Sequence, residues 1–483
     1  MKYSVKVNGV SVPVQTARVS AQPLNKVWDG DQRPVGQTEE AYFVSFDLHA
    51  PAVVTVEVTS GFTSYEIRPK AFSLGDTPSG NSVTLTVDRP MQFTFEPDGS
   101  HHTLHVFVNP PAQKPVGDLL YFGPGRHKAD LIWLESGQTL YIDEGAVVYG
   151  VVYAKDVENV RIMGRGILDA SPYRRGNDDH PGDREIIDAL YEKGFSELDV
   201  KYYGNLVLNH CRNVLVEGII LKDAPMWSLI TRNDCENIVI DNVKLIGQWR
   251  YNADGIDICT SKNVTVRNSF VRSFDDCFVA RGAYLEGETG NVEKVTVENC
   301  VFWCDWGKTV ELWCGQKPTA IRDICVTDCY FVHLSSAALN IATWYGSDSS
   351  VVENIVFRNL FIDGDEAYPN LVVEKPGRTG YSPVPGFIPY LLHVSAEKLG
   401  VMRGLGTQIC APVEDYSIFR IRYRNILLDS IRCDDSRLKV DVCRLTDGVL
   451  TIEDIRTKNC DFQIEMRTAR PGNRMQGGTE VNK

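Results

Sequence analysis

Short segments of one pattern recur along most of the chain and constrain its fold more than any other feature. Each has a polar residue, then an apolar–polar–apolar alternation and often a closing Asn or Asp, as in "CENIVIDNV" and "SKNVTVRNS". The anchor residues of these segments are Asn159, Asn213, Asn237, Asn263, Lys294, Asp323, Asn354, Asn425 and Asp454. Most successive anchors lie 24–31 residues apart, and the wider intervals of 54 and 71 residues carry insertions near 171–204 and 363–417.

A β-rich repeat of this length predicts a right-handed parallel β-helix, which we place at residues 119–465. One coil is too small to bury its own apolar face, so coils must stack, and stacked Asn side chains can satisfy one another's amides. A leucine-rich repeat would show an L-x-x-L-x-L consensus with helical segments, and a propeller would need four strands in each blade of about 40 residues. The observed repeat fits neither.

The first 108 residues follow a different pattern. Alternating runs such as "AVVTVEVTS" and "SVTLTVD" are separated by turn-rich stretches, which predicts an antiparallel β-sandwich over 1–108. Residues 109–118, "NPPAQKPVGD", are a proline-rich linker, and residues 466–483 form a polar tail. The predicted fold class is therefore all-β, a sandwich followed by a parallel β-helix.

Charge and cysteine usage narrow the function classes. The net charge is −13 and no basic block occurs, so we expect neither nucleic acid nor an anionic membrane as partner. The N-terminus lacks the apolar core of a signal peptide and no segment approaches a membrane span, so we expect the protein to be cytoplasmic, or secreted if a leader has been removed. A native-looking Met1 favours the first. The 13 cysteines recur at the repeat spacing, which indicates small buried residues with reduced thiols. Cys300, Cys304, Cys325 and Cys329 have C-x3-C rather than C-x2-C spacing, so we expect neither zinc nor any other cofactor.

Three aspartates fall in two apolar stretches, "NADGIDI" and "FDDCFVA". Asp254 precedes Asp275 and Asp276 by 21 and 22 residues, which is about one coil, so the three should stack about 4.8 Å apart. Neighbouring residues of a regular strand face opposite ways, so the Asp-Asp pair must lie at a bend, a bulge or a strand end to face one cleft. A lone Asp-Gly is ordinary turn chemistry, but two adjacent carboxylates before an apolar run cost stability, which indicates that they either face solvent or have a function.

Carboxylates this close raise the pKa of at least one of them, which places a proton donor beside ionised bases. Such a set can hydrolyse a glycosidic bond: one acid protonates the leaving oxygen and the other groups activate water on the opposite face. An acid and a base about 6.5–9.5 Å apart give inversion at the anomeric carbon.

Over about residues 150–360 the sequence resembles the polygalacturonase family, glycoside hydrolase family 28, in its Asn-x-Asp-Gly and Asp-Asp motifs. The resemblance implies a parallel β-helix and inverting hydrolysis of a pectic polysaccharide. It also implies that Asp275 is the general acid, that Asp254 and Asp276 hold the water, and that Asn252 orients the cluster.

Two motifs of that family are missing. Its Gly-His-Gly segment is replaced by "DWGKTVELW", with Gly307 and Lys308, and its Arg-Ile-Lys by "AALNIATWYG", with Leu339, Asn340 and Ile341. A uronate would lose its charge-assisted clamp, so the substrate should differ from plain polygalacturonate. Family 49, whose dextranases and isopullulanases combine three aspartates on a β-helix with an N-terminal sandwich and act on neutral glucans, is the second resemblance.

Several further side chains are candidates for binding sugar. Trp306 and Trp344 could stack on sugar rings, although core packing is the alternative role for each. Lys308 and Glu311 could bind hydroxyl groups or form a surface ion pair. His180 and His210 fit loops or turns better than catalysis, and His333 has no informative spacing. A non-catalytic sugar-binding scaffold would not need the three aspartates, and a lyase or epimerase would use calcium with a base such as Lys308.

Overall fold

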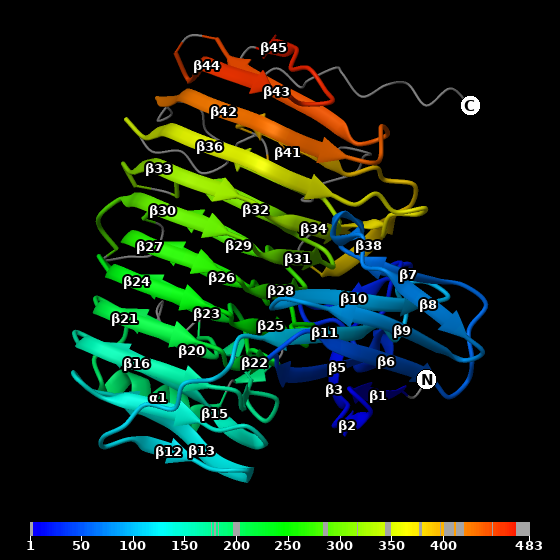
Figure 1. Ribbon diagram of the computed structural model, residues 1–483. Coiled ribbons are helices and arrows are strands. Elements are labelled where there is room, and N and C mark those ends of the chain that lie inside the picture. The colour runs from blue at the N-terminus through cyan, green and yellow to red at the C-terminus, as the bar shows by residue number, and fades with distance from the viewer. Residues whose placement is uncertain are drawn as a thin grey trace.

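The chain was described from a computed structural model. It covers residues 3–174, 176–177, 180–181, 183–196, 203–283, 288–315, 317–342, 349–375, 379–396, 398–399, 410–411, 420–446 and 448–469. Two sheets form an N-terminal sandwich and one large sheet forms the solenoid (Figure 1). No helix among these residues is long and apolar enough to cross a membrane.

The sandwich consists of two five-stranded sheets. One has the order β2 (Val10–Val12), β1 (Tyr3–Val7), β6 (Ala52–Val58), β9 (Ser82–Val87), β8 (Asp76–Ser79). The other has the order β3 (Gln15–Ser20), β5 (Thr38–Asp47), β11 (Leu104–Asn109), β10 (Met91–Pro97), β7 (Tyr65–Arg68). In β6 every second residue is buried, as the apolar–polar alternation of its sequence requires. Valine, leucine and phenylalanine side chains from both sheets form the shared core.

The solenoid is built from three ladders of parallel strands. The first contains β12 (Leu120–Phe122), β14 (Thr139–Ile142), β16 (Glu158–Gly164), β21 (Arg212–Glu217), β24 (Glu236–Asp241), β27 (Lys262–Arg267), β30 (Val292–Glu298), β33 (Ala320–Thr327), β36 (Val351–Ile362), β42 (Ile421–Cys433) and β44 (Leu450–Lys458). The second contains β13 (Gly125–Leu134), β15 (Ala146–Lys155), β17 (Ile167–Asp169), β22 (Ile220–Lys222), β25 (Lys244–Ile246), β28 (Phe270–Ser273), β31 (Val301–Cys304) and β34 (Tyr330–His333).

The third ladder carries the candidate site. It contains β20 (Leu206–Asn209), β23 (Leu229–Arg232), β26 (Ile256–Cys259), β29 (Phe278–Arg281), β32 (Lys308–Trp313), β35 (Ala337–Ala342), β39 (Tyr390–Ser395), β43 (Lys439–Leu445) and β45 (Met466–Ala469). β45 pairs with β43, so the solenoid extends past the predicted boundary at 465 and the first four residues of the predicted tail are a strand. The predicted right-handed parallel β-helix is confirmed.

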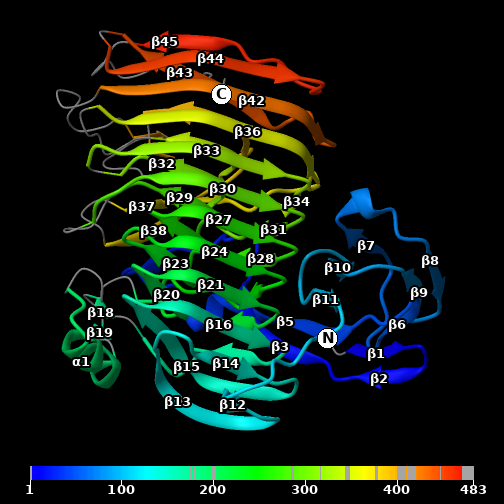
Figure 2. The same ribbon diagram turned by 60° about the vertical axis from the view of Figure 1, so that its left-hand side comes forward.

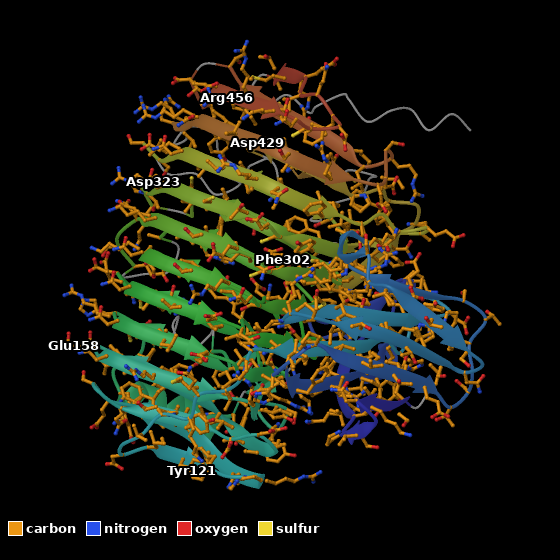
Figure 3. The ribbon with its side chains drawn as sticks, in the orientation of Figure 1. Tyr121, Glu158, Phe302, Asp323, Asp429 and Arg456 are labelled. Atoms are coloured by element: carbon orange, nitrogen blue, oxygen red, sulfur yellow. The ribbon has the colours of Figure 1, made fainter. Side chains whose placement is uncertain are left out.

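The anchor residues stack on successive coils and several of them hydrogen-bond to one another, as the repeat predicted. All nine have positive φ, and asparagine and aspartate tolerate this conformation better than most residues. Their amides form a ladder: Asn213 Nδ2 donates to Asn159 Oδ1 at 3.2 Å, Asn237 to Asn213 at 3.1 Å and Asn263 to Asn237 at 3.2 Å. The anchor Asp323 accepts from Asn354 Nδ2 at 2.9 Å and lies at the same edge of the solenoid as Glu158, the residue before Asn159 (Figure 3).

The sandwich packs on the second ladder. Ala17, Phe43 and Phe107 of the sandwich share an apolar cluster with residues of β22, β25, β28 and β31, among them Trp303. Figures 1 and 2 both place the sandwich beside the middle of the solenoid rather than beyond its end. Residues 110–118 of the predicted linker lie between β11 and β12, whereas its first residue, Asn109, is the last residue of β11.

Insertions add the remaining elements. Residues 171–204 contain β18 (Gly176–Asn177), β19 (His180–Pro181) and α1 (Arg184–Glu192), and the later insertion contains β37 (Leu371–Glu374), β38 (Gly380–Val384), β40 (Lys398–Leu399) and β41 (Cys410–Ala411). β38 pairs with β4 (Trp28–Asp29), so one small sheet joins the insertion to the N-terminal region. Two 3₁₀ turns, Val35–Gln37 and Lys70–Phe72, lie in the N-terminal region.

Cysteines whose side chains the structure describes are all free thiols, and most are buried in the solenoid. Cys211 and Cys235 illustrate the predicted stacking, because the Cys211 N–H donates to Cys235 Sγ on the next coil. No group of three or more His, Cys, Asp or Glu side chains in the described part of the chain has the arrangement of a metal site.

Candidate active site

The three aspartates lie in the turns that lead into two strands of the third ladder. Asp254 precedes β26, and Asp275 and Asp276 lie between the end of β28 at Ser273 and the start of β29 at Phe278. The Gly255 N–H donates to the Asp276 carbonyl at 2.7 Å, which sets the two turns directly above each other. The Asp-Asp pair therefore lies in a turn outside regular strand, as the prediction of one shared cleft required.

Each aspartate has defined partners. Arg281 Nη2 lies 3.3 Å from Asp254 Oδ2, and Asn252 Nδ2 donates to Asp275 Oδ2 at 3.2 Å. The Lys308 N–H donates to Asp276 Oδ1 at 2.7 Å. Asp254 Oδ1 is buried and has no hydrogen-bond partner among the described residues. The hydrogen-bonding capacity of this carboxylate oxygen is therefore not used by any described protein group.

Burial and mutual repulsion shift the titration of the cluster. Asp254, Asp275 and Asp276 are 2%, 8% and 3% exposed. The pKa of Asp254 is raised well above its usual value, first by burial and then by the charges of Asp257, Asp275 and Asp276. Burial also raises the pKa of Asp275 and of Asp276, and the nearby Lys308 ammonium opposes both shifts. The cluster can hold a proton where isolated aspartates would be ionised.

Gly307 allows the coil above to approach the pair. A Cβ at this position would lie 2.5 Å from Asp276 Oδ1 and 2.5 Å from the Asp276 backbone nitrogen. Any other residue would have to displace the turn that carries Asp275 and Asp276, so the glycine of "DWGKTVELW" has a steric reason that sequence alone did not give.

Lys308 and Glu311 lie within the cluster rather than on an open binding surface. Lys308 Nζ is 3.5 Å from Asp276 Oδ1 and 3.5 Å from Glu311 Oε1. The Glu311 carboxyl is 3% exposed and accepts a hydrogen bond from Asn340 Nδ2 at 3.0 Å. Burial, and then the charge of Asp276, raise the pKa of Glu311 to about 7.

Trp306 borders the site as part of an aromatic cluster. Its ring stacks on Phe274 with centroids 5.1 Å apart, and its Nε1 donates to the Val372 carbonyl at 3.1 Å. Tyr251 and Tyr381 pack against it, which ties the insertion to the turns that carry the aspartates. Trp344 lies outside the described residues.

Sequence reasoning missed Asp257 and Arg281. Asp257 is fully buried on β26, Arg281 Nη2 lies 3.0 Å from its Oδ1, and burial raises the pKa of Asp257 to about 7. The guanidinium of Arg281 lies between two indole rings, 4.0 Å from the centroid of Trp227 and 4.7 Å from that of Trp313. The signal was present, since a charged residue stands in each of the short apolar strands "IDIC" and "FVAR".

His210 and His333 are not in the aspartate cluster. His210 Nδ1 is 2.7 Å from Asp156 Oδ1 in an exposed pair, and His333 is buried between Glu96 and Asp365. The side chain of His180 lies outside the described residues.

Comparison with known proteins assigns the family. The sequence profile of "Glycosyl hydrolases family 28" matches residues 127–376, which is more than half of the chain. The chain belongs to glycosyl hydrolase family 28. The match includes all three aspartates, Lys308 and Glu311, so the first of the two resemblances is confirmed by sequence.

Individual relatives are distant and overlap only partly. An exopolygalacturonase of Arabidopsis thaliana is 29% identical over 161 residues, which are 33% of this chain and 36% of the relative. A polygalacturonase of Cochliobolus carbonum is 24% identical over 204 residues, 40% of this chain and 52% of the relative. The chain thus matches about a third to a half of the length of these two relatives.

The solved structure of Dex49A from Penicillium minioluteum has a TM-score of 0.60 with 14% identity, over 94% of this chain and 88% of that one. This likeness shows a shared fold that includes the N-terminal region.

Proposed function

We propose that this protein is an inverting glycoside hydrolase that acts on a polysaccharide or oligosaccharide. The observation that carries the proposal is the convergence of Asp254, Asp275 and Asp276 in one buried cluster in which the pKa of each is raised. Family membership and the relatives named as polygalacturonases support the same reaction class.

We assign the general acid to Asp275 because its place in the Asp-Asp motif matches the acid of the family. Asn252 donates to Asp275 Oδ2, so Oδ1 is the oxygen that can hold the proton. Asp275 transfers this proton to the glycosidic oxygen while the bond from the anomeric carbon to that oxygen breaks. The leaving sugar departs as an alcohol.

Asp254 and Asp276 are the bases on the water side. The unpartnered Asp254 Oδ1 can accept a hydrogen bond from water, and Arg281 fixes the other oxygen of the same carboxylate. The water attacks the anomeric carbon from the face opposite the leaving group, and its proton passes to this pair of carboxylates. Attack from the opposite face inverts the configuration.

A neutral sugar fits the cleavage position better than a uronate. Arg232, Arg281 and Lys308, the cations on described strands β23, β29 and β32, each lie near protein carboxylates. At the place of the missing Arg-Ile-Lys motif, Leu339 and Ile341 pack into the solenoid core and Asn340 bonds to Glu311. A substrate carboxylate would find these cations already engaged.

A panel of pectic, dextran and pullulan oligosaccharides, with Asp275→Asn as the matched control, tests the proposal. We expect the wild-type protein to release shorter sugars from at least one member and the variant to release almost none. Efficient hydrolysis of unmodified polygalacturonate would contradict the neutral-sugar proposal. Binding to a panel member without any hydrolysis would identify a sugar-binding scaffold and overturn the enzymatic one.

A further inference from the structure

Glu311 is a fourth carboxyl group of the cluster to which the mechanism above gives no role. It lies on β32, and its register partners are Val279 on the coil below and Asn340 on the coil above. Its side chain faces the groups around Asp276, and the carboxyl is almost completely removed from solvent.

The two oxygens of Glu311 have different surroundings. Asn340 Nδ2 donates to Oε1 at 3.0 Å, and Lys308 Nζ lies 3.5 Å from that same Oε1. Lys308 Nζ lies 3.5 Å from Asp276 Oδ1 as well, so the carboxyls of Glu311 and Asp276 are neighbours and a hydrogen bond between them is within reach. Two carboxyls can bond to each other only if one carries a proton. Since Oε1 already receives donors, Oε2 is the oxygen of Glu311 that can carry it.

A buried histidine fixes the orientation of the asparagine behind Glu311. The ring nitrogen His393 Nδ1 lies 2.7 Å from Asn340 Oδ1, so this nitrogen carries the hydrogen and donates it. The amide nitrogen of Asn340 must then point at Glu311. His393 is fully buried, burial lowers its pKa to about 4, and the ring is neutral at ordinary pH. Uncharged hydrogen bonds thus run from His393 to Asn340 and from Asn340 to Oε1 of Glu311.

We propose that Glu311 is a positioning residue that keeps its own proton and donates it in a hydrogen bond to Asp276, so that Asp276 stays ionised as a base among other carboxylates. This inference rests on the proposed function. It replaces the predicted role of Glu311 in binding sugar, because its carboxyl is enclosed by protein groups.

The charges that face Glu311 agree with this assignment. Asp276, Asp275 and Asp257 disfavour its ionisation, and Lys308 and Arg281 favour it. Burial outweighs the two cations and raises the pKa of Glu311 from the ordinary 4.5 to about 7. Lys308 Nζ lies 3.5 Å from each of the two carboxyls, but only Asp276 also accepts the Lys308 backbone N–H, at 2.7 Å, which stabilises a negative charge on Asp276.

Two variants separate a proton-carrying role from the alternatives. Glu311→Gln keeps an acceptor for Asn340 and gives Asp276 a permanent donor, whereas Glu311→Ala removes both. The control is Glu353→Gln, a mostly buried carboxylate on β36 that pairs with Arg424 away from the cluster. Infrared pH titration of the free proteins reads the protonated carboxyl directly, without a substrate.

We expect the infrared difference between wild type and Glu311→Gln to show a protonated carboxyl at pH 5.5 that titrates near neutral pH, and the control to lack it. On the panel sugar that the wild type cleaves fastest, Glu311→Ala should lower kcat about 10- to 100-fold, as expected for one hydrogen bond to a charged group. The kcat of Glu311→Gln should stay within about threefold of the wild-type value. The wild-type kcat should decline as Glu311 ionises with rising pH, and the variant should not show this decline.

Three results would overturn the proposal. An infrared titration that shows Glu311 ionised at pH 5.5 would mean that Glu311 has no proton to donate to Asp276. Equal loss of kcat in the Gln and Ala variants would make Glu311 a base, and a rise in KM alone would make it a sugar ligand. If no panel sugar is cleaved, the proposed function fails, while the infrared titration still decides whether Glu311 holds the proton.

Discussion

The asparagine ladder and the aspartate cluster, which consists of Asp254, Asp275 and Asp276 with their neighbours, are both stacks of polar side chains at a spacing of one coil. In the ladder, Asn213, Asn237 and Asn263 each donate to the residue below and accept from above where a partner exists. In the cluster, Asp254 and Asp276 occupy equivalent positions of adjacent coils, and the backbone of one turn bonds to the other. The same backbone repeat therefore serves two kinds of side-chain chemistry.

The difference lies in what each side chain can offer its neighbour. An amide has a donor and an acceptor, so identical amides satisfy one another without charge. Adjacent carboxylates have only acceptors when ionised, so the cluster needs protons and the cations Arg281 and Lys308. A stack of carboxylates whose ionisation destabilises the folded state indicates a functional site. A stack of amides that hydrogen-bond to one another indicates a structural role.

The largest expected effect comes from removing the proton of the general acid. Asp275→Asn should lower kcat by about 10²–10⁴-fold, which is the usual contribution of general acid catalysis. Folding should be nearly unaffected because asparagine is close to isosteric and removes a repulsive charge. Turnover of the cleaved panel sugar and thermal unfolding together provide the measurement.

An aryl glycoside of the released sugar, with a good leaving group, supplies the control because it needs little protonation. The loss in Asp275→Asn should be much smaller on it. An equal loss on both substrates would assign Asp275 a different role.

A smaller loss of kcat is expected when Gly307, which lets the next coil pack closely against Asp276, is replaced. Gly307→Ala places a Cβ against Asp276, which should displace the turn and cost about 1–3 kcal/mol of stability. Because a misplacement of about 1 Å can cost 10²-fold, kcat should fall by up to that factor. Circular dichroism melts and steady-state kinetics measure both. Gly75→Ala is the control, because Gly75, like Gly307, does not have positive φ and a Cβ there would meet nothing within 4 Å.

The cluster should be destabilised by rising pH, unlike the ladder. The pKa of Glu311 in the folded state is about 7, above its ordinary 4.5, so the folded state binds the proton more tightly. Stability should therefore fall as pH rises from about 4.5 to about 7, by up to about 3 kcal/mol. Glu311→Gln lacks this dependence, and its Tm relative to wild type should rise between pH 5 and pH 8. A constant difference in Tm over that range would contradict the assignment.

The smallest effect is expected in the ladder. Asn237→Ala removes two exposed amide hydrogen bonds and places alanine at φ 60°, which should cost about 1–2 kcal/mol without changing kcat. Asn237→Gly keeps the backbone conformation and removes only the side-chain bonds, so it should lose less. A large fall in kcat for either variant, measured beside urea unfolding, would show that the ladder and the cluster are coupled.

The sequence predicted the repeat, the ladder and the meeting of the three aspartates, because all three follow from spacing along one chain direction. It could not predict how Glu311, Asn340 and His393 connect, since that depends on which polar residue of each strand faces the cluster. The pairing of β4 with β38 was also beyond reach. Those strands lie about 350 residues apart in sequence, and no periodicity links them.

The configuration of the first product tests the central claim most directly. Proton NMR of the cleaved panel sugar, recorded within minutes of adding wild-type protein, resolves the two anomers before mutarotation mixes them. An acid at Asp275 and a water held by Asp254 and Asp276 predict that the new reducing end first appears with inverted configuration. A first product of retained configuration would mean that one of these carboxylates attacks the sugar directly, and it would contradict the account.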